Sequence, residues 1–297
     1  MPMNYDRLFQ NRVWLPKLGE ITLSSLLIAL ISGVLLIPGF QSAVTPFKSV
    51  SDLVNSGLFG HFLHSCHVYA ADLFLAALFL HALEYVLKQS FSTYDGLSWL
   101  WLTLLAATGL AVVFSGFLSL GSMESQDALR IARNIFGQLG NTGQALARFF
   151  LLATAKGSVL TVLLHHAATF SILSIVLTFV HLKRLNADGY AFYYTLILIA
   201  LLAVLFPAGI GTAPGAELAV VKGPWYFRGL QEMLSWQPAW VAGIVFPLLL
   251  LLVFALLPLW PARQPWLKRL FFILIVFYLI ETLIATFLRG AGWQLNV

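Results

Sequence analysis

The sequence predicts an all-α integral membrane protein with about seven transmembrane helices. Hydrophobic residues make up 60% of the 297 residues, charged residues only 10%, and the mean hydropathy is +0.87. Soluble domains carry roughly 25% charged residues. The apolar runs do not alternate with polar residues, as the strands of a membrane barrel would. Each run is long enough to cross a hydrocarbon core of about 30 Å as a helix.

The spans follow one another with short polar connections between most of them. They are expected at about 18–38, 61–87, 97–119, 157–183, 190–208, 238–258 and 267–288. The first eleven residues contain Asp6 and Arg7 and no apolar core, so they are not expected to form a secretory signal. Lys and Arg residues weakly favour an inner N-terminus.

Two connections are long. In residues 120–156, Ala128, Ala132, Ile135 and Leu139 recur at helical intervals, which predicts a helical hairpin lying on the membrane surface. A solvated loop is the alternative. The connection 209–237 is rich in Gly and Pro before a set of aromatic residues that suit the membrane interface: Trp225, Tyr226, Phe227 and Trp236.

Four histidines inside the apolar runs form two pairs. His67 and His81 are 14 residues apart, and His166 and His181 are 15 apart. These steps return to within about 40° and about 60° of the starting direction, and they span about 21 to 22 Å. Two such helices, side by side and antiparallel, are expected to place His67 opposite His166 and His81 opposite His181. Because imidazole is a usual axial ligand of haem iron, the pattern predicts two bis-histidine haem groups stacked across the bilayer.

The other histidines fit this pattern less well. His64 lies about 100° from His81 around the helix, and His61 and His165 lie about 160° from their distal partners. The alternative is that intramembrane histidines only form hydrogen bonds between helices, which is common for a single histidine. Two pairs of matching length are harder to explain in that way.

The number of cysteines and the net charge limit the cofactors and partners that the chain can have. Cys66 is the only cysteine, so the chain offers no internal disulfide, no covalent haem attachment motif and no iron–sulfur ligand set. The haem groups are therefore expected to be non-covalent haem b. The net charge of +5 and a pI near 9.4 fit basic rims on anionic lipid, and nothing points to nucleic acid.

With these histidine spacings, the chain resembles the cytochrome b family of quinol–cytochrome c and quinol–plastocyanin oxidoreductases. The resemblance runs from about Leu18 to Trp260. The 14 and 15 spacings are similar to the short bacterial and plastid type, here in a fused form with a degenerate quinol-oxidation motif. The resemblance implies a four-helix di-haem bundle in residues 1–188 and a three-helix domain in residues 189–297. It also implies glycines that let the porphyrins approach. Gly19 and Gly33, 14 apart in the first span, and Gly116 in the third match this feature, but an upper glycine in the third span is not evident.

The sequence also departs from the family. Gly223-Pro224-Trp225-Tyr226-Phe227 stands where the family has Pro-Glu-Trp-Tyr, so Pro224 replaces the glutamate of the quinol-oxidation site. His64 and Glu84 occupy positions where the family has arginines. Lys17 stands near the position of the plastid branch's extra haem cysteine, so no third haem is expected.

A bis-histidine haem has no vacant iron position, so it passes electrons. The expected function is therefore that of a di-haem subunit in a multi-pass respiratory or photosynthetic complex of the bacterial cytoplasmic membrane. It would move electrons between the quinone pool and partners such as an iron–sulfur protein or a multihaem c-type cytochrome. The alternatives are the cytochrome b anchor of a dehydrogenase or reductase, and a haem-free proton-coupled transporter.

The quinone-site candidates lie on both faces. Glu232 and Tyr226 are the candidate catalytic groups, and Trp225, Phe227, Lys183 and Asp188 are candidate quinone contacts. Either Glu232 replaces the missing glutamate, or the outer haem exchanges electrons with a partner and quinone turnover occurs chiefly at the inner face. The sequence favours the second arrangement.

Overall fold

The computed structural model describes residues 16–40, 46–151, 159–182, 189–216 and 220–290. These residues are mostly helical, and they contain no strand. Six of the helices are long and apolar enough to cross a membrane, and a seventh, α10, is apolar but shorter. The predicted all-α membrane fold with about seven spans is confirmed.

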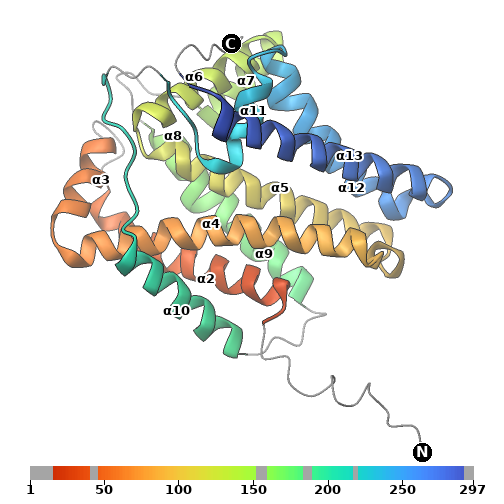
Figure 1. The fold of residues 1–297 in the computed structure, drawn as a ribbon, viewed down its shortest axis with the longest axis horizontal. Helices are drawn as coiled ribbons and strands as arrows, with labels where there is room; N and C mark the ends of the chain where they lie inside the picture. Colours follow the sequence, from red (N-terminus) through yellow and green to blue (C-terminus); the bar gives the residue numbers. More distant parts are fainter. Residues whose placement is uncertain (1–15, 41–45, 152–158, 183–188, 217–219, 291–297) are drawn as a thin grey trace, which may run out of the picture.

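The first half of the chain forms a bundle of four spans. They are α2 (Leu18–Leu36), α4 (Leu58–Leu87), α5 (Gly96–Ser119) and a fourth span built from α8 (Leu160–Leu164), a π-helix (His165–Phe170) and α9 (Ser171–Leu182). α2 packs along α4, and α5 packs along α9 (Figure 1). The two histidine-bearing spans, α4 and α8–α9, lie across the bundle from each other.

The two histidine-bearing spans run in the same direction, because α5 returns the chain between them. His67 faces His166 at the ends where both spans begin, and His81 faces His181 near the ends where both finish. The expectation of antiparallel helices was therefore wrong. The expected pairs do face each other, and this pairing requires the two spans to be parallel. We call His67/His166 the outer pair and His81/His181 the inner pair, after the predicted orientation.

Short elements connect the spans. The hairpin predicted in residues 120–156 is present as α6 (Met123–Gly137) and α7 (Gly140–Leu151), with Leu129, Ala132 and Ile135 buried. A helix that the sequence did not predict, α3 (Pro46–Asn55), lies between the first two spans. Polar side chains fix helix starts: Asp95 accepts a hydrogen bond from the Ser98 backbone at the start of α5.

The last helices lie on two sides of this bundle. α10 (Tyr190–Leu205) packs on α2 and α4, with Ile199 and Ala203 against Ile28 and Ala70. A π-helix (Val241–Val245) continues into α12 (Phe246–Leu259), which packs on α5 and lies antiparallel to α13 (Gln264–Leu283). Figure 1 shows α10 well separated from α12 and α13. The domain boundary at residue 188 stays a prediction.

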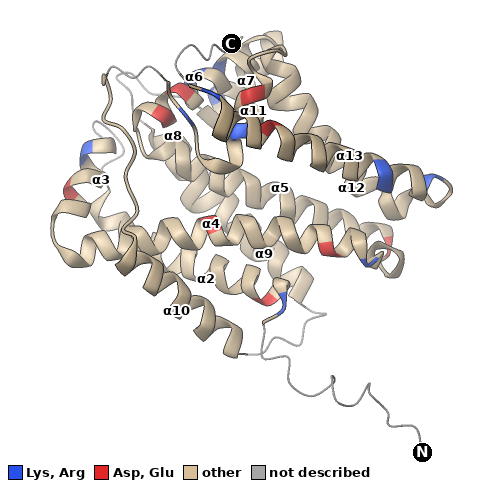
Figure 2. Cartoon of the chain, viewed as in Figure 1, with Lys and Arg blue, Asp and Glu red and all other residues tan. Residues whose placement is uncertain are grey.

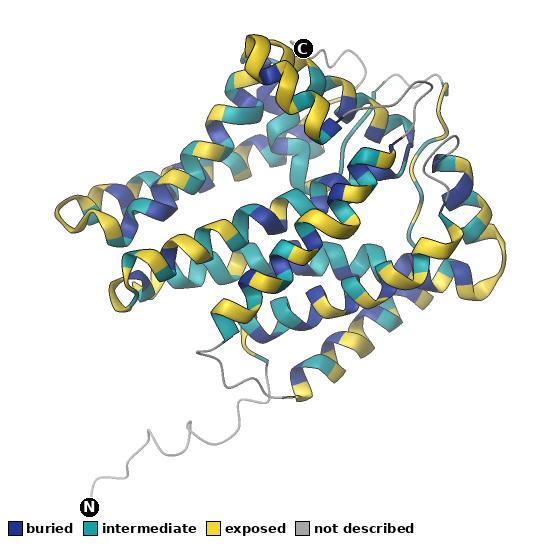
Figure 3. Cartoon of the chain, turned by 180° about the vertical axis from the view of Figure 1, so that it is seen from behind, coloured by how far each residue is buried: buried dark blue, intermediate teal, exposed yellow. Residues whose placement is uncertain are grey.

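Burial and charge follow the expectation for a chain in lipid. Large apolar side chains are exposed along the outer helix faces, as the yellow stripes in Figure 3 show. Most charged residues lie at helix ends and in connections (Figure 2). In lipid an outward apolar face is stable, so the interior is distinguished by small and polar residues rather than by hydrophobicity. Ser25, Ser65 and Ser174 are fully buried in this interior.

Polar contacts tie the connection after α10 to the rest of the chain. The Thr212 hydroxyl donates to Glu124 at the start of α6 at 2.6 Å, and the Met123 backbone N–H donates to the Thr212 carbonyl at 2.9 Å. The connection ends in a short turn, Trp225–Phe227, followed by α11 (Arg228–Met233). α11 then packs against α13.

A buried ion pair anchors α11 to the end of the last span. The Glu232 carboxylate is 2% exposed and accepts hydrogen bonds from the Arg289 guanidinium, with Nε at 2.9 Å from Oε2. Hydrogen bonding to this carboxylate raises the pKa of Arg289. The only other side-chain donor to Glu232 among the described residues is the Ser235 hydroxyl, at 3.3 Å. Removing one partner would leave the buried carboxylate with little compensation.

We therefore expect Arg289→Gln to lower the melting temperature of the detergent-purified protein by several degrees, because it leaves a buried charge unpaired. The double variant Glu232→Gln/Arg289→Gln should recover most of that loss. Lys48→Gln, which breaks an exposed Lys48–Asp52 pair, is the control and should change the melting temperature little. A loss for Lys48→Gln equal to that for Arg289→Gln would contradict the argument.

Candidate haem and quinone site

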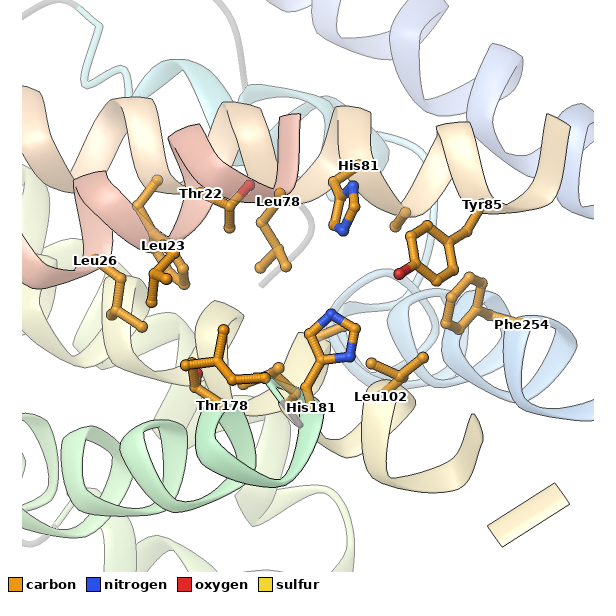
Figure 4. Close-up of a pocket in the computed structure, with 16 residues that line it drawn as sticks. Thr22, Leu23, Leu26, Leu78, His81, Tyr85, Leu102, Thr178, His181 and Phe254 are labelled. Carbon is orange, nitrogen blue, oxygen red and sulfur yellow. The ribbon is translucent and has the colours of Figure 1, made fainter. Parts of the chain in front are cut away.

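The two histidine pairs face each other inside the four-helix bundle. The ring centroids of His67 and His166 are 6.2 Å apart, and those of His81 and His181 are 6.5 Å apart. Figure 4 shows His81 from α4 and His181 from α9 pointing toward one another across a cavity. Two imidazoles on opposite sides of one metal ion, with nitrogen–metal bonds of about 2.0 to 2.1 Å, would have centroids roughly 6.4 Å apart. Both pairs match this separation.

Contacts through Nδ1 orient the rings of His67, His166 and His81. Nδ1 of His67 lies 3.0 Å from the Ala29 carbonyl, and Nδ1 of His166 lies 2.9 Å from the Val112 carbonyl. Such contacts fix the tautomer and leave Nε2 as the ligand atom. His81 instead contacts the Glu84 carboxylate through Nδ1 at 3.3 Å. Nε2 of His81 is buried and has no hydrogen-bond partner among the described residues, as expected of a ligand atom.

Three glycines allow the neighbouring spans to approach these rings. A Cβ at Gly19 would lie 3.0 Å from the His81 ring, one at Gly33 would lie 3.1 Å from His67, and one at Gly116 would lie 2.8 Å from His166. The sequence-predicted glycines thus each lie beside a different candidate ligand. No glycine of the described residues lies in this way beside His181; Leu102, 14 residues before Gly116, lines the cavity there.

The cavity at the inner pair is apolar. It is lined by residues of α2, α4, α5, α9 and α12. Phe254 closes one side, and Leu23, Leu26 and Leu78 close the other (Figure 4). Binding sites for cofactors are mostly apolar, with few polar groups. The donor set and the apolar lining fit a flat apolar macrocycle held by two imidazoles.

The competing histidines are placed elsewhere. His165 lies among Phe149, Phe150 and Phe170, with Nε2 at 2.9 Å from the Phe149 carbonyl. His64 is 4% exposed, and neither of its ring nitrogens has a hydrogen-bond partner in the described part of the chain. A buried imidazole without partners is unusual in a native structure. His64 is therefore a candidate to contact a polar group of a bound molecule beside the outer pair.

The π-helix at residues 165–170 explains the unequal spacings. A π-turn inserts one residue into an α-helix, so the 15-residue step from His166 to His181 becomes equivalent to the 14-residue step in α4. The Ser171 hydroxyl donates to the carbonyl of His166, five residues earlier, at 2.6 Å. The sequence-based angles assumed a regular α-helix and therefore missed this correction.

The quinone candidates meet different surroundings. Trp225 donates from Nε1 to Asp72 of α4 at 3.2 Å, and Phe227 packs on Phe114 of α5, with ring centroids 5.0 Å apart. Burial, and then the charge of Asp72, raises the pKa of the Tyr226 hydroxyl. Glu232 lies in the ion pair with Arg289 described above, and its catalytic role stays a prediction. Lys183 and Asp188 lie outside the described residues.

Sequence reasoning missed two acidic side chains that the structure brings into this region. Asp72 lies in the middle of α4, and the available signal was an ionisable residue inside a long apolar run. Glu84 was noted only as a departure from the family, yet it contacts His81. Glu281, in the last span, is 7% exposed and accepts a hydrogen bond from Trp236 at 3.4 Å.

These features define a multi-pass membrane protein whose helical bundle places two pairs of imidazoles in line across its interior. The chain belongs to the cytochrome b family: the family described as cytochrome b/b6/petB matches residues 9–189. The sequence-based identification is confirmed. Membership of this family implies haem b binding.

A relative and a solved structure agree with this assignment. "Cytochrome b6" of Heliobacterium mobile is 31% identical over 102 residues, which are 34% of this chain and 48% of that protein. The chain thus matches about half the length of that relative. A solved structure titled "Hyperthermophilic respiratory Complex III" has a TM-score of 0.68 at 18% identity, covering 97% of this chain and 90% of that chain. At this identity the likeness shows a shared fold.

Deleting Ala168 from the π-turn should leave the haem content unchanged, because the deletion converts a 15-residue step into a 14-residue step in a regular helix. Deleting Leu173 from α9 removes the same number of residues but leaves the π-turn intact, and it should rotate His181 by about 100°. Haem per chain, measured in the purified protein, distinguishes them. If deleting Ala168 removed haem, the π-turn would not set the direction of His181 relative to His166.

Proposed function

We propose that this chain is the di-haem cytochrome b subunit of a respiratory or photosynthetic quinol/quinone oxidoreductase complex in a bacterial cytoplasmic membrane. The observation that carries the proposal is the presence of two facing imidazole pairs at 6.2 and 6.5 Å, contributed by two parallel spans. Family membership supports haem b as the group that these imidazoles hold. His67 and His166 would bind the outer haem, and His81 and His181 the inner one.

Haem held by two histidines supplies one-electron transfer, since no iron position stays open for a substrate. The chain's own residues hold the imidazoles in orientation through the carbonyls of Ala29 and Val112 and the carboxylate of Glu84. The apolar lining of the inner cavity excludes water, which limits proton leakage beside the redox groups. Gly19, Gly33 and Gly116 let helices pass close to the ligand rings.

A lipid-soluble two-electron carrier is the partner that suits such an electron path, and quinones are of this class. The family oxidises quinol with the help of a glutamate. Pro224 stands at that position in this chain and has no acidic group, so the chain cannot use the same route. Electrons at the outer haem would then be exchanged with an extramembrane partner subunit, such as an iron–sulfur protein or a multihaem c-type cytochrome. The described residues contain no cluster of His, Cys, Asp and Glu suited to a further metal ion, so the partner would bring its own redox group.

Two b-type haem groups per chain are expected in the purified complex. A reduced-minus-oxidised optical spectrum should show a b-type α-band, and extraction of the haem should give two equivalents per chain. The same spectrum recorded with a quinol as reductant tests the link to the quinone pool. A protein without an α-band would contradict the proposal and favour the haem-free transporter.

Substitution of the ligands should remove the haem groups one at a time. His67→Ala or His166→Ala should remove the outer haem, and His81→Ala or His181→Ala the inner one, because each haem needs both imidazoles. The matched controls are His64→Ala and His165→Ala, which should retain two haem groups. Haem content and redox titration of each variant check this. Loss of a haem in His165→Ala but not in His166→Ala would overturn the assignment.

A further inference from the structure

An acidic side chain stands at membrane depth beside the aromatic turn Trp225–Phe227. Asp72 lies five residues after His67 and nine before His81 in the 30-residue helix α4. Its Cα is therefore about 7.5 Å along the helix axis from that of the outer-pair ligand. Ionisable residues inside a transmembrane segment are costly and mark functional sites by default. Asp72 therefore needs an explanation.

The position of Asp72 relative to the turn is defined by contacts. The Trp225 indole donates to the Asp72 carboxylate at 3.2 Å. Tyr226 packs against the cluster of Leu26, Phe74, Leu75 and Val113, inside the four-helix bundle. Phe227 packs on Phe114 and Phe117 of α5. The turn thus runs from α4 toward α5, with the carboxylate at its open end.

The carboxylate is accessible and has no basic partner. Asp72 is half-buried and Trp225 is 44% exposed, so their contact does not lie in a closed core. No Lys, Arg or His forms a salt bridge with Asp72 among the described residues. Glu232, by contrast, is 2% exposed and bound by Arg289, and Glu281 is 7% exposed. Of these three acids near the turn, Asp72 alone is partly exposed and forms no salt bridge among the described residues.

We propose that Asp72 is the proton-exchanging carboxylate of a quinone site where α4 meets the turn Trp225–Phe227. The inference rests on the proposed function. It names the acidic group that would take the place of the family's glutamate, whose position is held here by Pro224. A flat aromatic ring can stack on or meet the edge of the indole of Trp225. Because the pKa of Tyr226 is raised, its hydroxyl stays protonated and can donate a hydrogen bond but cannot take the proton.

The chemistry balances with the groups already named. Oxidation of one quinol breaks two O–H bonds and releases two electrons and two protons, leaving the quinone. The electrons pass to two one-electron acceptors, which in the proposed function are the two haem groups. The carboxylate of Asp72 accepts one proton and becomes a carboxylic acid, and water at the outer face accepts the other. Quinone reduction is the same step in reverse.

This site revises the expectation that quinone turnover occurs chiefly at the inner face. The acid has moved from the connection after the fifth span to the second span, 153 residues earlier than Trp225. A positioned base contributes typically about 10² to 10⁴ in rate. A change of that size separates a proton-exchanging group from a residue that only packs.

The test measures the rate at which a short-chain quinol reduces the haem groups of the intact complex. Asp72→Asn and Asp72→Ser should slow this reduction about 10² to 10⁴-fold while dithionite still gives the full α-band. Asp72→Glu, which keeps the acid, should stay within tenfold of the parent rate. Trp225→Phe keeps the acid and an aromatic ring but removes the hydrogen bond to Asp72, so its loss of rate should be smaller than that of Asp72→Asn. Asp52→Asn removes an exposed carboxylate of α3 and is the matched control.

Each contrary result has a distinct meaning. Near-parent rates in Asp72→Asn would overturn the inference. A loss in Trp225→Phe as large as in Asp72→Asn would show that Asp72 only anchors the turn. Loss of haem in both Asp72→Asn and Asp72→Ser would make the residue structural, which also overturns it. If the parent complex carries two haem groups but is not reduced by quinol, then the quinone part of the proposed function fails, before any Asp72 variant is compared.

Discussion

The separation between α4 and the α8–α9 span governs the rest of this structure. Two imidazole pairs must each keep a spacing near 6.4 Å, about 21 Å apart along the helices, so both spans must hold their phase and their distance. α2 and α5 fix that distance from the two sides. Their glycines contact the ligand rings, and their carbonyls at Ala29 and Val112 set the ring orientation. A larger residue at Gly116 would displace the ring of His166.

The same constraint explains local irregularities in the helices. A π-turn has poorer hydrogen bonding than a regular α-helix and is frequent at functional sites. At residues 165–170 it corrects the phase of His181 and turns His165 away into a cluster of phenylalanines. The inner pair differs from the outer pair in its second contact, because His81 meets a carboxylate and not a carbonyl. An anionic partner makes an imidazole a stronger electron donor to a metal, so Glu84 would distinguish the two haem environments.

Electrostatics in the C-terminal half divide structural acids from exposed ones. Glu232 and Arg289 form a buried pair that holds α11 against the end of the last span, and Glu281 is buried nearby. A buried pair of this kind restricts geometry more than it adds stability. Asp72, in α4, forms no such ion pair among the described residues and accepts a hydrogen bond from Trp225. Glu232, which the sequence analysis proposed as a catalytic acid, is therefore less accessible in the fold than Asp72.

The sequence by itself determined the membrane class, the spans and the histidine pairs, because hydropathy and helical periodicity act over short distances along the chain. Gly19 and Gly33 are 14 residues apart, as are His67 and His81. This shared spacing was predictable for the same reason. The tertiary structure decided what depends on distant segments. The parallel direction of the two ligand spans, the placement of α10 apart from α12 and α13, and the contacts Asp72–Trp225 and Glu232–Arg289 join residues far apart in sequence. No local period encodes such contacts, since they arise only when the helices pack.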